Sequence, residues 1–295
     1  MGYLRSIGGN SLQGVRASAI AAARKRKAHR HHRLIEAEII DPTQMPPGQR
    51  EIVFRRLYRV HQQIFAGVPI ENFMAYLVRP EAVRTRIQLY RNETGRIVGY
   101  CAVHLFERAI DRRTVGVIRA EAGLLPGYRG TSATLWFGGS EALRYKALHP
   151  LRTTVLFATP VHPSSYHMLS KYLWRSYPYP GRKTPPWVQR LLEGLADTSG
   201  SEPANPADPL LRDVGWITRE TAAERKNWQS SPEQDIQYYL GRNPDYGRGI
   251  GLAMISPLAP GNLIMSTAQY LSHLVLRGLR RLWQWIFSFP AHQRR

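Results

Sequence analysis

The chain of 295 residues is long enough for one large domain or two small ones, and its hydrophobic content of 43% supports a packed core and excludes global disorder. The single cysteine, Cys101, excludes an internal disulfide and a cysteine-based metal site, and its apolar surroundings in the sequence favour a core position over a nucleophile. The net charge of +20 is concentrated at the ends: eight Lys/Arg in residues 1–33 and five Arg in residues 277–295, with no acid in either, leave +7 for the residues between.

Residues 1–33 begin the chain as a basic segment rich in Gly, Ser and Ala. Charge repulsion and the lack of a large apolar face predict a mobile arm. Basic arms of this kind suit nucleic acid, an anionic membrane or an acidic protein, although an arginine-rich composition alone also produces such a charge. The first thirty residues lack the long apolar block of a secretory signal, so we expect a cytoplasmic protein.

The middle of the chain alternates strands and helices up to residue 174. The spacing of apolar residues predicts strands at 34–40, 86–91, 96–106, 113–125 and 153–158, and helices at 51–65, 70–77, 132–148 and 164–174. The sequence Asn92-Glu93-Thr94-Gly95 predicts a hairpin between the second and third strands. The order is therefore β-α-α-β-β-β-α-β-α, an α/β (α+β) fold with a mixed, mostly antiparallel sheet flanked by helices.

The remainder of the chain extends this unit. Residues 177–213 are irregular in pattern, apart from a helical piece near 187–195, and we expect an insertion near 177–230. A helix at 231–240 and a strand at 249–257 follow, and apolar residues at steps of three, four or seven predict a long helix over 262–289. We expect an arm at 1–33, a main domain at 34–260 and an amphipathic basic helix at 261–295.

The segment that follows the strand at 113–125 has the pattern of an anion-binding loop. Pro126-Gly127 makes a turn, Tyr128-Arg129-Gly130 follows, and a helix opens at once with small residues. A strand that breaks into a turn and then opens a helix leaves a row of free backbone N–H groups, which bind pyrophosphate or another anion. The pattern indicates a site for a thioester cofactor or a nucleotide.

This loop, in that order of elements, resembles the GNAT superfamily of N-acyltransferases over residues 34–175. The resemblance implies acyl transfer to an amine from a donor thioester, either acyl-CoA or acyl-4'-phosphopantetheine on an acyl carrier protein, and no metal. It also implies that the backbone of the strand end contacts the pantetheine arm while the helix start holds the phosphates. The cofactor-binding residues implied in this way are Leu124, Leu125, Arg129, Gly130, Thr131, Ser132, Ala133 and Thr134.

Two departures from the family pattern bear on the donor and on the leaving group. Ser132 and Thr134 stand where the family carries Gly or Ala, and such a loop also occurs in relatives that use acyl carrier protein. The helix at 164–174 places Ser170 where the family carries its general-acid tyrosine, so that Tyr166 or Tyr172 takes this role only if the helix is rotated.

Two titratable residues on neighbouring strands are the candidates for catalysis. Glu121 lies on the strand just before the loop, among apolar residues, where a carboxylate is costly unless it is paired or functional. It is our candidate general base, and an ion pair with Arg119 is the structural alternative. His104 alternates with Ala102 and Phe106 and is the second candidate, with a satisfied core histidine as its alternative.

The sequence leaves three functions open. The first is an N-acyltransferase of long-chain donors, peripheral to an anionic membrane through its basic C-terminal helix with Trp283 and Trp285. The others are a non-catalytic protein of this fold that binds nucleic acid or a membrane through its arms, and an acetyltransferase of protein or RNA. A helix docked on the core is the alternative for the C-terminal segment, and the oligomeric state is open.

Overall fold

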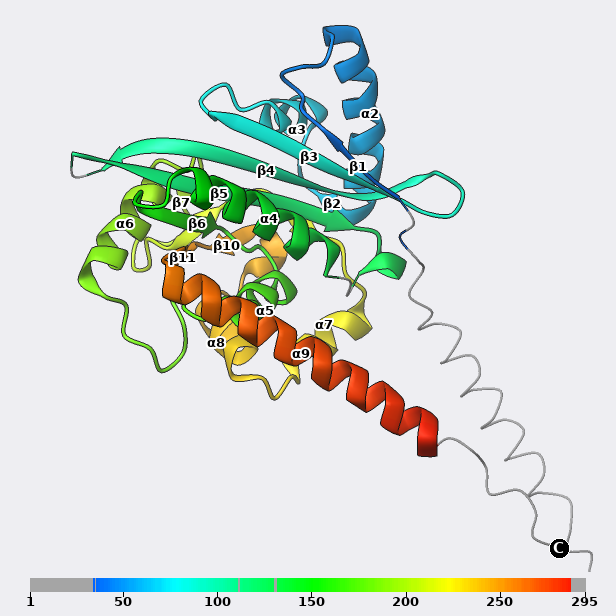
Figure 1. Cartoon of the computed structure of the whole chain (residues 1–295), viewed down its shortest axis with the longest axis vertical. Helices are drawn as coiled ribbons and strands as arrows, with labels where there is room; N and C mark the ends of the chain where they lie inside the picture. The colour runs from blue at the N-terminus through cyan, green and yellow to red at the C-terminus, as the bar shows by residue number, and fades with distance from the viewer. Residues whose placement is uncertain (1–33, 35, 111, 130–131, 288–295) are drawn as a thin grey trace, which may run out of the picture.

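A single six-stranded sheet organises the computed structural model, which describes residues 34, 36–110, 112–129 and 132–287 (Figure 1). Its strand order is β1-β3-β4-β5-β6-β11, with β5 and β6 parallel and the other neighbours antiparallel. The strands are β1 (Glu36–Ile40), β3 (Arg84–Arg91), β4 (Ile97–Ile110), β5 (Arg113–Leu124), β6 (Thr154–Ala158) and β11 (Met254–Pro257). The predicted fold class, a mixed and mostly antiparallel sheet flanked by helices, is confirmed.

The helices connect these strands in the predicted order. They are α2 (Pro47–Ile64), α3 (Ile70–Leu77), α4 (Ala133–Leu148) and α5 (Pro163–Tyr172). The turn between β3 and β4 also follows its sequence, because the side-chain oxygen of Asn92 accepts from the N–H groups of Thr94 and Arg96, and Gly95 adopts a φ of 73°.

Helices cover both faces of the sheet because successive side chains of each strand point to opposite sides. On β4, Tyr100 and Ala102 pack with α2 and α3, whereas Cys101 and Val103 pack beneath Phe137 of α4. Cys101 is fully buried, as expected for a core residue, and burial raises the pKa of its thiol to about 12.

The residues after α5 form more regular structure than their pattern predicted. They contain α6 (Pro186–Asp197), β7 (Glu202–Pro203), β8 (Leu211–Asp213), β9 (Ile217–Thr218), α7 (Ala222–Gln229), α8 (Gln234–Arg242) and β10 (Ile250–Leu252). The predicted strand at 249–257 is two strands: β10 pairs with β8, and β11 extends the main sheet beside β6. Helix α6 buries Val188, Leu192 and Leu195 over the same face of the sheet as α2 and α3.

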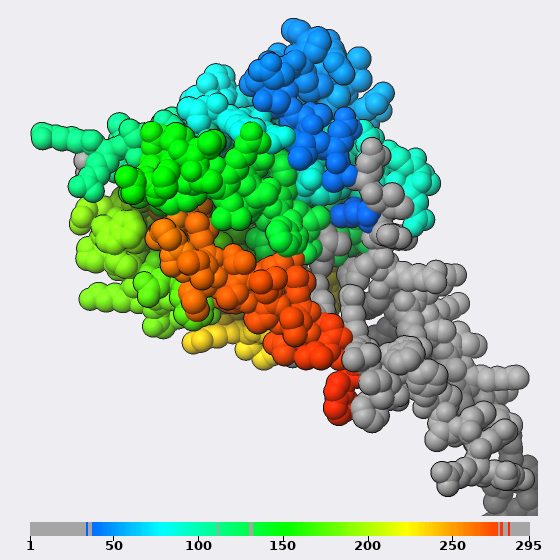
Figure 2. Space-filling view, viewed as in Figure 1, coloured from blue at the N-terminus to red at the C-terminus, as the bar shows by residue number. Residues whose placement is uncertain are grey.

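The last helix, α9 (Pro260–Phe287), crosses the surface beside α4 and α5 (Figure 2). One side of it is attached to the body of the protein: Gln269 donates to the Lys171 carbonyl, the Ser266 hydroxyl accepts from the Trp174 N–H, and Tyr270 donates to the Ser132 hydroxyl. In the part of the chain that is described, no helix is long and apolar enough to span a membrane.

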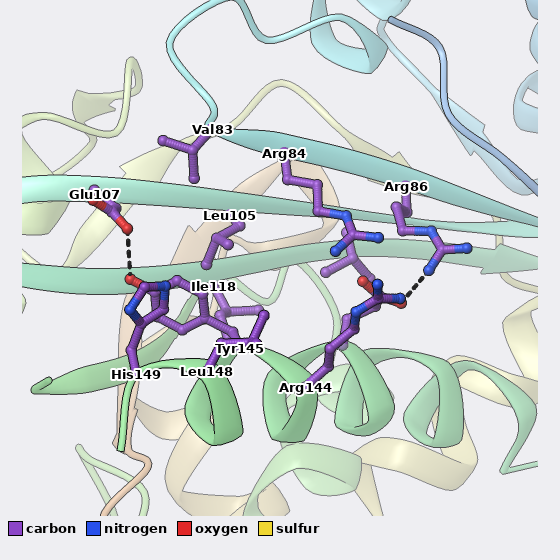
Figure 3. Close-up of a pocket in the computed structure, with 12 residues that line it drawn as sticks. Val83, Arg84, Arg86, Leu105, Glu107, Ile118, Arg144, Tyr145, Leu148 and His149 are labelled. Carbon is purple, nitrogen blue, oxygen red and sulfur yellow. Dashed lines mark hydrogen bonds and ion pairs between the residues drawn. The ribbon is translucent and has the colours of Figure 1, made fainter. Parts of the chain in front are cut away.

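A cavity of about 270 Å³ lies between the C-terminal half of α4 and strands β3 to β5 (Figure 3). Arg84, Arg86 and Arg144 gather at one end, where Arg86 pairs with Glu141 at 3.0 Å. At the other end Tyr145 donates to Glu107. The cavity is separate from the loop that precedes α4, because the α4 residues that line it begin at Glu141, two turns after the helix starts.

Candidate active site

Strands β5 and β6 pair over only three residues and then diverge. Their parallel register joins Gly116–Ile118 to Thr154–Leu156, so the second half of β5 keeps only β4 as a neighbour among the described strands. On the α4 face of this half-strand, Ala120 and Ala122 are exposed although they lie in the middle of the sheet. The divergence leaves one backbone edge open to an extended ligand, beside two side chains too small to fill the space.

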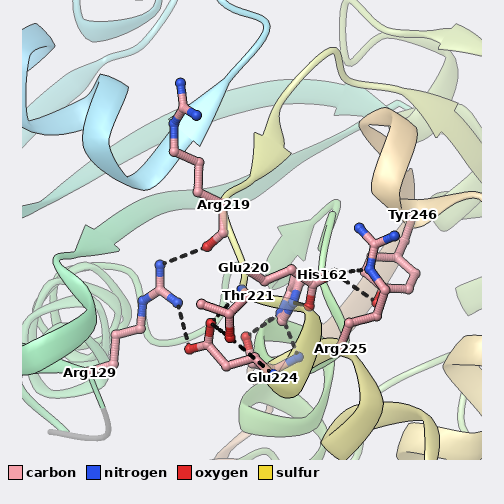
Figure 4. A network of polar contacts seen from close by, with 9 residues as sticks. Arg129, His162, Arg219, Glu220, Thr221, Glu224, Arg225 and Tyr246 are labelled. Atoms are coloured by element: carbon pink, nitrogen blue, oxygen red, sulfur yellow. Dashed lines mark hydrogen bonds and ion pairs between the residues drawn. The ribbon is translucent and has the colours of Figure 1, made fainter.

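The loop that follows β5 has one feature that its sequence did not predict: Arg129 folds back onto the strand. Its Nε donates to the Leu124 carbonyl at 3.2 Å, its guanidinium donates to the Arg219 carbonyl, and it lies 3.7 Å from the Glu224 carboxylate (Figure 4). The carbonyl at the strand end, which the resemblance gives to pantetheine, is therefore already bonded. Arg129 thus connects the loop to the segment at 219–224 through hydrogen bonds and an ion pair.

The start of α4, where the sequence predicts an anion site, has an uncapped first turn. Among the described residues no side chain caps its first turn: Ser132 occupies the N-cap, but its hydroxyl accepts from Tyr270 instead. Ala133 and Thr134 follow as the first helical residues, with their N–H groups directed out of the helix end. Leu124 is buried, Leu125 donates its N–H to Val98, and Gly130 and Thr131 lie outside the described residues.

Both predicted catalytic residues lie on the opposite face of the sheet, together with a third residue. Glu121 of β5 faces Ala102 in the β4–β5 register, and His104 is the next residue on that face of β4. His61 of α2 meets the same face, with its Nδ1 atom 2.8 Å from the Tyr100 hydroxyl. Trp216 packs against His61 with ring centroids 4.6 Å apart, and Tyr76 packs against both Trp216 and His104. We call His61, His104 and Glu121 the central cluster.

Each member of the central cluster has one buried polar atom without a hydrogen-bond partner in the described structure: Nε2 of His61, Nε2 of His104 and Oε2 of Glu121. The other ring nitrogen of His104 lies 2.9 Å from the Thr85 hydroxyl. A buried polar group without a partner is costly, and three close together on one face require an explanation. All three atoms are available to a bound polar molecule.

Burial sets the charge of the central cluster. It raises the pKa of Glu121 well above the usual range, so the folded protein favours the neutral acid. It lowers the pKa of His61 to about 4, and burial together with the positive charges of Arg79 and Arg119 lowers that of His104 to about 3. Both imidazoles are neutral at pH 7. The alternative role of Glu121, an ion pair with Arg119, is absent from the described contacts, and Arg119 donates to the Ser199 carbonyl instead.

A second buried group, which the sequence did not indicate, links α5 to the segment at 219–224 (Figure 4). His162, the N-cap residue of α5, lies 3.0 Å from Glu220 through Nε2 and 2.7 Å from the Ser164 hydroxyl through Nδ1. Glu220 also accepts from Arg225 at 2.8 Å and from Tyr246 at 3.0 Å. We call Ser164, His162 and Glu220 the α5 triad.

The tyrosines of α5 are held away from the general-acid role. Tyr166 is fully buried and donates to the Pro178 carbonyl at 2.8 Å, and Tyr172 packs against Tyr270 of α9. Ser170 is buried, and its hydroxyl lies close enough to that of Tyr166 to act on the pKa of that tyrosine. In the same residues no group of three His, Cys, Asp or Glu is placed to hold a metal ion.

The order and register of these elements decide the fold. They run from β1 through α2, α3 and the β3–β4–β5 meander to α4, β6 and α5, with β5 and β6 diverging at the loop. The chain has the GNAT fold. No family model and no curated protein matches it.

Solved structures of GNAT proteins are also similar to the chain. They include the ribosomal-protein-alanine N-acetyltransferase of Brucella melitensis biovar Abortus 2308, with 13% identity, 51% of this chain and 98% of that chain covered, and a TM-score of 0.33. Naa20 of Chaetomium thermophilum in complex with a bisubstrate analogue has 9% identity, with 76% of this chain and 86% of that chain covered, and a TM-score of 0.35. NAA60 of Arabidopsis thaliana in complex with acetyl-CoA has 14% identity, with 48% of this chain and 87% of that chain covered, and a TM-score of 0.32.

Proposed function

We propose that the chain is an N-acyltransferase that moves an acyl group from a thioester to an amine. The observation that carries this proposal is the position of Glu121, a buried carboxyl with an unpartnered oxygen, on the strand that leads into an uncapped helix start. The divergence of β5 and β6 supports it, because the open edge beside Ala120 and Ala122 has room for the pantetheine arm. The helix start supplies N–H groups for a phosphate.

In this mechanism Glu121 takes a proton from the acceptor ammonium, and the free amine attacks the thioester carbonyl. A general base that works near neutral pH needs a pKa above that of an exposed glutamate, and burial raises the pKa of Glu121 in this direction. The unpartnered nitrogens of His61 and His104 flank the same face and position the acceptor amine. Loss of charge on the ammonium also removes the cost of keeping it in a buried site.

The test is thiol release by the purified full chain with panels of acyl-CoA and acyl carrier protein thioesters and simple amines. We expect Glu121→Gln to lower kcat/KM by about 10²- to 10⁴-fold, the usual contribution of a general base. Glu107→Gln is the matched control, because it changes a carboxylate of the neighbouring strand that pairs with Arg152 at the far end of the sheet. Equal turnover by Glu121→Gln and wild type would contradict the role of Glu121, and no turnover with any donor would contradict the function.

For the finer assignment we propose a long acyl chain, delivered at an anionic membrane surface. The side of α9 opposite its attachment carries Ile264, Leu271, Val275 and Leu279, which recur at helical spacing and are 51% to 67% exposed. Five arginines and no acid in residues 277–295 match a negative surface. An exposed apolar stripe with adjacent positive charge supports a lipid surface over an acidic soluble protein.

Co-sedimentation with vesicles tests this surface. We expect binding to vesicles of mixed zwitterionic and anionic lipid, weaker binding to zwitterionic vesicles, and loss of binding in Leu271→Gln/Val275→Gln. Ser272→Gln is the matched control on the same turns of α9, because Ser272 is already polar and exposed. If the wild type ignores anionic vesicles and sediments as a dimer that the double substitution dissociates, the stripe joins two copies and the membrane assignment is wrong.

A further inference from the structure

The α5 triad has the hydrogen-bond order of a serine nucleophile, its base and an orienting carboxylate. The Ser164 hydroxyl lies 2.7 Å from Nδ1 of His162, and Nε2 of His162 lies 3.0 Å from Glu220. These distances are within the range at which a base activates a hydroxyl and a third group holds the base. The arrangement is recognised by geometry and by roles, whatever the order of the residues along the chain.

The backbone fixes the tautomer of His162. The Ser164 N–H donates to Nδ1 at 3.2 Å, so Nδ1 is the acceptor nitrogen and Nε2 carries the hydrogen that Glu220 accepts. Burial is the largest effect on His162 and lowers the pKa of its ring, which is therefore neutral at pH 7. A neutral imidazole whose acceptor nitrogen faces a serine hydroxyl is the form that takes up a proton.

Glu220 is built to remain ionised. Burial alone raises its pKa, but hydrogen bonds from His162, Arg225 and Tyr246 outweigh burial and lower the pKa below the usual range. The side chains of His162 and Glu220 are only 4% and 3% exposed, whereas Ser164 is partly exposed. Capping of α5 requires only the ring nitrogen that faces the helix. A buried carboxylate with three side-chain donors is more than a cap needs.

The triad lies beside the proposed donor. The helices α4 and α5 both start beyond the carboxyl ends of the parallel strands β5 and β6, where the two strands diverge. Arg129, which holds the end of β5, pairs with Glu224 in the same short segment that carries Glu220. The charge of Arg129 also acts on the pKa of His162, which places the two side chains within electrostatic range.

We propose that Ser164 is a nucleophile that accepts the acyl group from the thioester, with His162 as its base and Glu220 as the positioning residue. The proposal rests on the proposed function for the identity of the donor. Its chemistry is a two-step transfer through an ester on the protein, with release of the acyl group to water as a second activity when no amine is bound.

The steps balance without a further reactant. Ser164 Oγ bonds to the thioester carbonyl carbon while its proton passes to His162 Nδ1. The C–S bond then breaks, and the thiolate leaves with the proton from His162. In the second step the amine or water attacks the ester carbonyl and gives a proton to His162, which returns it to Ser164 Oγ as the ester C–O bond breaks.

A fluorophosphonate probe, which labels activated serines, tests the nucleophile without any thioester. We expect wild type to be labelled at Ser164, Ser164→Ala to be unlabelled, and Ser165→Ala, the neighbouring serine in the same turn, to be labelled at the wild-type rate. His162→Asn keeps an N-cap acceptor and removes the base, so we expect labelling about 10²- to 10⁴-fold slower with α5 intact by circular dichroism. No labelling of wild type, or equal labelling of Ser164→Ala, would overturn the proposal.

Intact mass measurement after a rapid quench with acyl-CoA then separates this proposal from the proposed function. An acyl adduct in wild type and Ser165→Ala, absent from Ser164→Ala, supports the two-step route. Full transfer to an amine by Ser164→Ala overturns the triad and leaves the acyltransferase standing. Probe labelling of Ser164 without turnover of any thioester supports the nucleophile and counts against the thioester donor.

Discussion

Two glutamates with buried carboxyl oxygens, Glu121 and Glu220, lie in opposite surroundings. Glu121 has an oxygen without a partner in the described structure, and burial raises its pKa. Glu220 accepts from His162, Arg225 and Tyr246, and these donors keep its pKa below the usual range. The same residue type is thus a neutral acid in one place and a fixed anion in the other. The number of hydrogen-bond donors, more than burial, decides whether a glutamate is suited to transfer a proton or to orient a neighbouring side chain.

The largest effect that we expect is at Glu121, where a substitution should lower activity without lowering stability. Glu121→Gln should lose about 10²- to 10⁴-fold in kcat/KM, while its free energy of unfolding at pH 8 equals or exceeds that of wild type. The reason is linkage: a carboxyl whose folded pKa is raised stabilises the fold at low pH and loses that contribution as the pH rises through the folded pKa. Urea unfolding at pH 8 and pH 4 measures this, and a less stable variant at pH 8 would contradict the assigned charge.

The pH profile of the reaction tests the same group in wild type. Because Glu121 must be ionised to accept a proton, kcat/KM should rise with pH through a midpoint well above the usual glutamate range. The neutral imidazoles, with pKa values lowered to about 3 for His104 and about 4 for His61, add no step near pH 6.5. An inflection near pH 6.5 that disappears in His104→Asn would show that a histidine, rather than Glu121, is the base.

At Glu220 we expect a loss of stability instead of a gain. Glu220→Gln removes the charged acceptor of three donors and should lower the free energy of unfolding at pH 7 by about 2 kcal/mol, the usual contribution of a hydrogen bond to a charged group. A carboxyl with a depressed pKa contributes stability above its unfolded pKa and loses it as the pH falls through the folded pKa. The difference from wild type should therefore shrink below pH 4. A variant as stable as wild type at pH 7 would show that the network is not ionised.

The smallest effect concerns the support of His104. Thr85→Val removes the hydroxyl that lies 2.9 Å from His104 Nδ1 and keeps the shape of the side chain. We expect a loss of about 1 kcal/mol in the free energy of unfolding and a several-fold loss in kcat/KM, since one buried hydrogen bond contributes about that much. An unchanged KM for the amine in this variant would contradict the proposed role of His104 in positioning the acceptor.

The sequence predicted the sheet well because its signals there are local. The meander follows from alternation and from the turn at Asn92–Gly95, and Glu121 and His104 stand out as polar residues in apolar strands. His61 was missed, although its signal is present: it falls in the apolar stripe of α2 between Leu57 and Ile64, where a histidine is out of place. Glu220 left no such signal. It meets His162 across 58 residues, and long-range pairs of this kind have no trace in local spacing.

The bond between Tyr270 and Ser132 connects the surface helix to the donor loop. The Tyr270 hydroxyl of α9 donates to the residue that caps α4, and its ring meets that of Trp136 one turn further on. Under the proposed function, a donor phosphate that took the Ser132 hydroxyl would compete with this contact, so donor binding would loosen α9 and release of α9 would tighten donor binding by the same factor. Through one tyrosine, the proposed membrane surface and the proposed donor site would be thermodynamically linked.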